Sequence, residues 1–118
     1  MTLEEAIQEI PQGWYKAFGK EMYDELSAMI KAQSDVIDNY EVIQVKEKFG
    51  ELRWYDEDGT TQTDEIIDKY SEISSRTCIV CGKPATRITI GWICPYCTEC
   101  FEQFYHGAKF IEIGGEKE

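Results

Sequence analysis

Five cysteines gather in the last third of the chain, at spacings that suit metal binding. Two of them lie in Cys78-Ile-Val-Cys81, and the other three lie in Cys94-Pro-Tyr-Cys97-Thr-Glu-Cys100. Thiolates three residues apart can bind one tetrahedral Zn²⁺, because a tight turn brings both sulfurs to the same side. Cys78, Cys81, Cys97 and Cys100 leave fifteen residues between the two pairs, which is typical of structural zinc sites. We therefore predict a structural Zn²⁺ held by these four thiolates.

The fifth thiol leaves an alternative ligand set open. Exchanging Cys100 for Cys94 gives twelve residues between the pairs, which also suits a metal, and Pro95 is a familiar residue inside a zinc-binding turn. We favour Cys97 and Cys100 because an apolar pattern of helical period follows them, starting at Phe101. Thiolates in the first turn of a helix are stabilised by its dipole.

Two enzymatic interpretations of the cysteines fail on sequence grounds. Cys94-Pro-Tyr-Cys97 matches the motif of dithiol glutaredoxins, but only 21 residues follow it and none is proline, so the strands and cis-proline of that fold are missing. A zinc deaminase needs a His-x-Glu before its cysteines, whereas His106 follows all of them. We find no nucleophile elbow or phosphate-binding glycine loop. The sequence predicts no catalysis.

The net charge of −11 is carried by the first 75 residues, which hold 18 acidic and 7 basic side chains. Such a surface repels phosphate backbones, so nucleic acid is not the expected partner. The acidic surface either keeps the protein soluble or docks on a basic surface of a protein partner. The candidate partner-binding residues are Asp56, Glu57, Asp58, Asp64, Glu65 and Asp68.

The first 75 residues predict helices around a β-hairpin. Thr2-Leu-Glu-Glu5 has the form of a capping box and opens a short helix. Apolar residues then recur at three- and four-residue steps over 14–33, which predicts an amphipathic helix. Residues 40–55 read as a β-hairpin that turns at Gly50, and a second long helix is expected to begin with Thr63 as its cap.

The cysteine region predicts a small zinc module. A turn over 78–82 with Gly82 is expected to be followed by a hairpin that pairs 85–90 with 92–93, and then by a helix reaching Ala108. This order is that of a treble-clef zinc finger, with a zinc ribbon as the alternative. The fold class is thus α+β, with a body over 1–75 and a zinc module over 76–118 that pack as one unit. Residues 114–118 read as a frayed tail.

Several of these motifs together resemble a family of small bacterial and phage proteins without an established activity. The resemblance rests on Gly13-Trp14-Tyr15, on Val45-Lys-Glu-Lys-Phe-Gly50 continued by Leu52-Arg-Trp-Tyr55, and on Arg76-Thr-Cys-Ile-Val-Cys-Gly82. A Gly-Trp segment and a second Cys-x-x-Cys complete it. Aligning Gly91-Trp92 implies that the second ligand pair is Cys97 and Cys100, and that Cys94 stands where relatives carry a basic residue.

The expected function is that of a non-enzymatic, zinc-stabilised acidic protein that engages or inhibits a host or defence protein. The resemblance implies a phage or prophage origin, and hence the cytoplasm of a bacterial host. No apolar run could cross a bilayer and no leader is present, so no membrane association is expected. The alternative is a nucleic-acid-binding regulator that would use Arg76, Lys83, Arg87 and Lys109 on phosphates and Trp92 or Tyr96 on bases.

Overall fold

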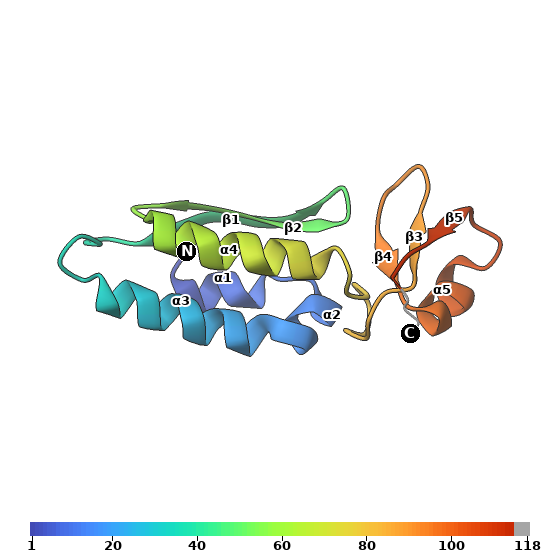
Figure 1. Ribbon diagram of the computed structural model, residues 1–118, viewed down its shortest axis with the longest axis horizontal. Helices are drawn as coiled ribbons and strands as arrows, with labels where there is room; N and C mark the ends of the chain where they lie inside the picture. Colours follow the sequence, from blue (N-terminus) through green and yellow to red (C-terminus); the bar gives the residue numbers. More distant parts are fainter. Residues whose placement is uncertain (115–118) are drawn as a thin grey trace.

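The first two thirds of the chain form a two-stranded sheet whose one face is covered by helices, and the last third forms a separate lobe (Figure 1). The computed structural model describes residues 1–114, so residues 115–118 of the predicted tail lie outside the described residues. The molecule is elongated, with principal extents of 52 × 27 × 19 Å. Helices together with antiparallel strands confirm the predicted α+β class.

The amino-terminal helices follow the predicted pattern with one deviation. Helix α1 spans Leu3–Gln8, and the capping box is present, because Thr2 Oγ1 accepts from the Glu5 N–H and the Glu5 carboxylate accepts from the Thr2 N–H. The predicted long helix is divided into α2 (Gln12–Trp14), a π-helical turn η1 (Tyr15–Gly19) and α3 (Lys20–Ala32). Its apolar stripe is buried as expected and consists of Trp14, Phe18, Met22 and Leu26.

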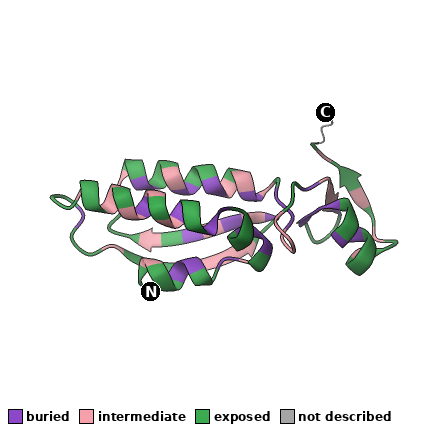
Figure 2. Ribbon diagram, turned by 90° about the horizontal axis from the view of Figure 1, so that it is seen from below, coloured by how far each residue is buried: buried purple, intermediate pink, exposed green. Residues whose placement is uncertain are grey.

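Strands β1 (Glu41–Lys48) and β2 (Glu51–Glu57) form the predicted antiparallel hairpin. Its two-residue turn has positive φ at both positions, 55° at Phe49 and 81° at Gly50, which is the backbone of a type I′ turn. Val42, Leu52 and Trp54 are buried on the sheet face that packs against the helices. In Figure 2, buried residues accordingly lie on the inner sides of the helices and strands.

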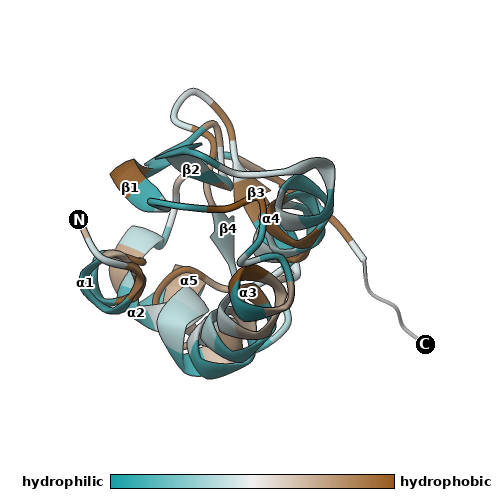
Figure 3. Cartoon of the chain, turned by 90° about the vertical axis from the view of Figure 1, so that its left-hand side faces the viewer, coloured by the Kyte–Doolittle hydropathy of each residue, from teal (hydrophilic) through white to brown (hydrophobic). Residues whose placement is uncertain are grey.

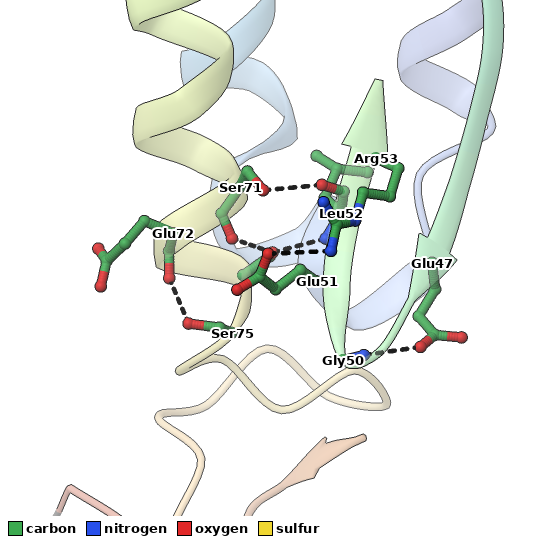
Figure 4. Close-up of polar contacts among 9 residues, drawn as sticks. Glu47, Gly50, Glu51, Leu52, Arg53, Ser71, Glu72 and Ser75 are labelled. Carbon is green, nitrogen blue, oxygen red and sulfur yellow. Dashed lines mark hydrogen bonds and ion pairs between the residues drawn. The ribbon is translucent and has the colours of Figure 1, made fainter. Parts of the chain in front are cut away.

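Helix α4 spans Thr61–Ser74, and the predicted start at Thr63 is wrong. Thr60 is the N-cap, since its hydroxyl accepts from the Thr63 N–H, and Thr63 lies inside the first turn as the reciprocal partner of this cap. The far end of α4 is attached to β2: the Ser71 hydroxyl donates to the Leu52 carbonyl over 2.9 Å, as Figure 4 shows.

The second lobe contains β3 (Arg87–Thr89), β4 (Pro95–Tyr96), α5 (Thr98–Tyr105) and β5 (Phe110–Glu112). The predicted strand partner over 92–93 is wrong, because β3 pairs with β4 and the intervening residues form a loop. The Thr89 hydroxyl closes this loop by accepting from the Cys94 N–H over 3.1 Å. The predicted helix reaches only Tyr105 rather than Ala108, and strand β5, which pairs with β3, was not predicted.

Candidate metal centre

Four cysteine sulfurs converge at the base of the second lobe. The Sγ atoms of Cys78, Cys81, Cys97 and Cys100 all lie within 4.8 Å of one another, and those of Cys81 and Cys97 are 3.6 Å apart. A zinc ion with Zn–S bonds of about 2.3 Å requires sulfur–sulfur distances of about 3.8 Å in a tetrahedron. The cluster can therefore hold a metal ion, and these four are the cysteines that the spacing favoured.

The first ligand pair lies in a tight turn between α4 and β3. The Gly82 N–H donates to the Cys78 carbonyl over 3.0 Å, and the Cys78 N–H donates to the Lys83 carbonyl over 2.7 Å. Gly82 has a φ of 89°, which favours glycine, and a Cβ atom there would lie 2.7 Å from the Gly13 carbonyl oxygen. This turn, residues 78–82, is called the knuckle below.

The second ligand pair belongs to the first turn of α5. Cys97 is the N-cap, and its sulfur accepts from the Cys100 N–H over 3.4 Å. A thiolate at this position satisfies one of the free N–H groups that begin every helix and interacts favourably with the helix dipole. The start of α5 therefore places the sulfurs of Cys97 and Cys100 close together, and this end of the helix faces the knuckle.

Protonation of the ligand thiols differs across the cluster. Burial raises the pKa of Cys97 and of Cys100 above the usual thiol range. Burial acts in the same direction on Cys78, but N–H groups directed at its sulfur outweigh it and lower the pKa of that thiol. Because metals bind thiolates, metal binding must release the protons carried by Cys97 and Cys100, the thiols whose pKa is raised.

Cys94, the alternative ligand, is not part of the cluster. Its side chain is 7% exposed and packs beside Cys78 and Tyr96 in the same apolar core. Burial, reinforced by the charge of Glu47, raises the pKa of the Cys94 thiol to about 11. A buried, protonated thiol behaves as a small apolar side chain. His106 is not a metal ligand either, since its side chain is exposed and its Nδ1 lies 2.7 Å from the Glu102 carboxylate.

The knuckle and the residue before it, Thr77, are held against the body by two residues that the sequence did not connect with the metal site. The Gly13 N–H donates to the Ile79 carbonyl, and the Trp14 indole N–H donates to the Thr77 carbonyl, each over 2.9 Å. A Cβ atom on Gly13 would lie 2.4 Å from the Cys78 carbonyl oxygen. The Pro-Gln-Gly sequence ahead of Trp14 is the only local signal at this position, and by itself it does not indicate a contact with the cysteines.

The acidic residues predicted to bind a partner have two different roles. Asp56 accepts from the Tyr40 hydroxyl over 2.6 Å, and the Asp58 carboxylate accepts from the N–H groups of Asp38 and Asn39, so both fix the fold. The four other carboxylates are exposed and make no hydrogen bond or ion pair within residues 1–114. These four are Glu57, Asp64, Glu65 and Asp68.

The cations of the nucleic-acid alternative are mostly neutralised. Three of the four form ion pairs, which are Arg76 with Glu72, Lys83 with Glu99 and Arg87 with Glu102. The Arg87 guanidinium also lies against the rings of Phe101 and Phe110, 4.9 and 4.2 Å from their centres. Tyr96 is 3% exposed and cannot stack on a base, whereas Trp92 is 51% exposed.

Comparisons with protein-family models, with curated proteins and with solved structures each gave no match. Within the part of the chain that the structure describes, none of the helices has the length and apolar character needed to span a bilayer.

Proposed function

We propose that the protein is a binding protein whose second lobe is a treble-clef-type module stabilised by structural Zn²⁺. The observation that carries the metal assignment is the composition of that lobe's core. Six buried residues form its hydrophobic cluster, and only Tyr96 and Phe101 among them are large, because the others are Cys94 and the three metal-site cysteines Cys78, Cys97 and Cys100. So small an apolar core supplies little folding free energy by itself, and small domains of this kind commonly rely on a structural metal.

The binding role is a proposal that rests on charge. Glu57, Asp64, Glu65 and Asp68 are exposed at the β2–α4 turn and along α4, and no cation of the described chain pairs with them. An uncompensated acidic surface increases the rate of encounter with a basic surface and favours that partner over acidic ones. We therefore propose a protein partner with a basic surface, and a non-enzymatic role. The resemblance to bacterial and phage proteins suggests a host or defence protein as that partner.

The metal is tested by elemental analysis of the purified chain together with circular dichroism during chelation. We expect one zinc per chain, and loss of ordered structure in the second lobe when a chelator removes it. Structural zinc contributes on the order of 10 kcal/mol of apparent binding free energy in small modules. A chain that contains no metal and keeps its near-ultraviolet spectrum in chelator would contradict the assignment.

The partner surface is tested by capture from a bacterial lysate with two matched variants. The first carries Asp64→Asn, Glu65→Gln and Asp68→Asn, which remove three charges from α4. The control removes three exposed charges elsewhere, at Glu9, Glu21 and Glu112. We expect the wild type and the control to capture the same protein at low salt, and the α4 variant to lose it. Equal capture by both variants would exclude the α4 surface.

A further inference from the structure

The two edges of the hairpin sheet differ in how far their backbone groups are hydrogen-bonded to the rest of the chain. The outer edge of β2 is closed by α4: the Leu52 N–H donates to the Ser74 hydroxyl over 2.8 Å, and the Leu52 carbonyl accepts from the Ser71 hydroxyl over 2.9 Å (Figure 4). Viewed along the long axis, α4 lies on the β2 side and β1 lies toward the outside of the molecule (Figure 3). The outer edge of β1 thus receives no such cover from α4.

The strand register shows which backbone groups of β1 point outward. Leu52 is paired with Glu47, and both backbone groups of Leu52 point away from β1. In an antiparallel ladder the pair is then a non-hydrogen-bonded one, so the N–H and the carbonyl of Glu47 point away from β2. The alternation of the ladder gives the same direction for Val45, which is paired with Trp54. Within residues 1–114 these outward groups have no hydrogen-bonding partner.

The same edge already pairs with an extended backbone at its beginning. The Val42 N–H donates to the Met1 carbonyl over 3.0 Å, and the Met1 amino group donates to the Val42 carbonyl over 2.8 Å. Val42 is the preceding outward position, separated from Val45 by the bulge between Val42 and Gln44. The edge of β1 is therefore able to pair with an added strand. Beyond the pairing with Met1, the outward backbone groups of Val45 and Glu47 have no hydrogen-bonding partner within residues 1–114.

The side chains around these free positions indicate what kind of strand would fit. Lys46 and Lys48 lie on the sheet face opposite the buried Leu52 and Trp54, because side chains alternate along a strand. Residues directly opposite one another on adjacent strands have Cβ atoms about 5 Å apart, where opposite charges attract. Phe49, beyond the end of β1, has its side chain 65% exposed. An acidic strand with an apolar end would complement this edge.

We propose that the outer edge of β1 binds an extended segment of a protein partner as an added strand. Val45 and Glu47 supply the backbone hydrogen bonds, and acidic residues at alternate positions of the segment face Lys46 and Lys48. This surface is separate from the acidic α4 surface and does not depend on it. A second copy of the chain fits less well, because antiparallel self-pairing through Val45 and Glu47 places two Lys46 side chains opposite each other.

A matched pair of variants at Glu47 separates what its backbone N–H contributes to binding from what its side chain contributes. Glu47→Pro and Glu47→Ala both remove the carboxylate that accepts from the Gly50 N–H, but only proline removes the Glu47 N–H. Proline is tolerated on an edge strand where the N–H faces solvent. We therefore expect both variants to unfold at nearly the same temperature. Lys46→Pro should unfold the hairpin, because the Lys46 N–H is directed at β2.

Binding is tested with a displayed library of linear twelve-residue peptides, selected on the full chain. Selected peptides should alternate acidic residues, bind Glu47→Ala as they bind the wild type, and bind Glu47→Pro at least tenfold more weakly. Adding peptide should slow amide hydrogen exchange at Val45 and Glu47, which in the free chain should be faster than at Lys46 and Lys48. Equal affinity for the two Glu47 variants, or no selected peptide, would overturn the proposal. So would a dimer in sedimentation that Glu47→Pro dissociates, since the occupant would then be a second copy.

Discussion

Replacing Gly13 by alanine should destabilise both lobes at once. The added Cβ atom would lie 2.4 Å from the Cys78 carbonyl oxygen and 2.5 Å from two backbone atoms of Ile79. Carbon and oxygen atoms without a bond between them normally stay more than 3 Å apart. Because all three neighbours are backbone atoms, no side-chain rotation relieves the contact. The knuckle or the α2 backbone must therefore shift by about 1 Å.

Such a shift breaks contacts whose cost can be added. The hydrogen bonds from Gly13 to Ile79 and from the Trp14 indole to Thr77 are both 2.9 Å long. Leaving a buried polar group unpaired costs about 1–3 kcal/mol, and overpacking a core adds about 1–3 kcal/mol. With both hydrogen bonds lost, these terms give a destabilisation of roughly 3–9 kcal/mol for Gly13→Ala. For a domain of this size, 1 kcal/mol lowers Tm by about 4 °C, so Tm should fall by more than about 10 °C.

The assay is differential scanning calorimetry together with the rate of zinc release to a colorimetric chelator. Gly91→Ala is the matched control, because Gly91 has a φ of 98° and a Cβ atom there would meet nothing within 4 Å. The control therefore measures backbone strain alone, about 1–2 kcal/mol. We expect Gly13→Ala to lose more stability than Gly91→Ala and to release zinc faster. If the two variants lose equal stability and release zinc at the wild-type rate, the contact between α2 and the knuckle does not contribute to the stability of either lobe.

Three further predictions concern the metal, a charge and a buried hydroxyl. Cys100→Ser should abolish metal binding, whereas Cys94→Ser should retain one metal ion per chain in elemental analysis; the reverse result would identify the other ligand set. The pKa of Glu25 is lowered below its usual 4.5, mainly by a hydrogen bond from the Lys69 ammonium group, which lies 2.6 Å from the Glu25 carboxylate. This ion pair therefore stabilises the fold above pH 4.5, and its contribution is lost as the pH falls further. Glu25→Gln should be less stable than the wild type by about 1 kcal/mol at pH 7. Urea titrations should show that this difference in unfolding free energy disappears in acid. Ser74→Ala leaves the buried Leu52 N–H unpaired and should cost about 1–3 kcal/mol in the same titrations, whereas the partly exposed Ser75→Ala should cost less than 0.5 kcal/mol.

Features set by residues close together in the chain could be predicted from the sequence. The capping box at Thr2 and the buried stripe from Trp14 to Leu26 follow from local spacing, and both are present. The cysteine pairs are local in the same sense, because a turn or a helix start places two thiols three residues apart on one side. A helix pattern beginning after Cys97 was sufficient to favour the pairs that the structure brings together.

Features decided by competition between neighbours or by distant contacts could not be predicted. Three threonines at the start of α4 can each act as a cap, and the hydroxyl of Thr60 is the one that reaches the Thr63 N–H. The partner of β3 was missed because Thr89 closes a loop that the alternation of apolar residues does not reveal. The contact of Gly13 with the knuckle joins residues more than 60 positions apart, and nothing local to either segment indicates it.

The knuckle belongs to both lobes, and this bears on where the chain can be divided. Ile79 packs against the body's core as well as against the cysteine core, and Thr77 accepts the hydrogen bond of the buried Trp14 indole. A body cut after residue 75, where the sequence suggested a boundary, would leave that indole without its acceptor and would uncover Gly13. A metal ion bound by the cluster would hold Cys78 in place between Thr77 and Ile79, and would so shape the surface against which the body packs. We therefore expect the proposed metal site to stabilise the body, through the knuckle, as well as the module that contains it.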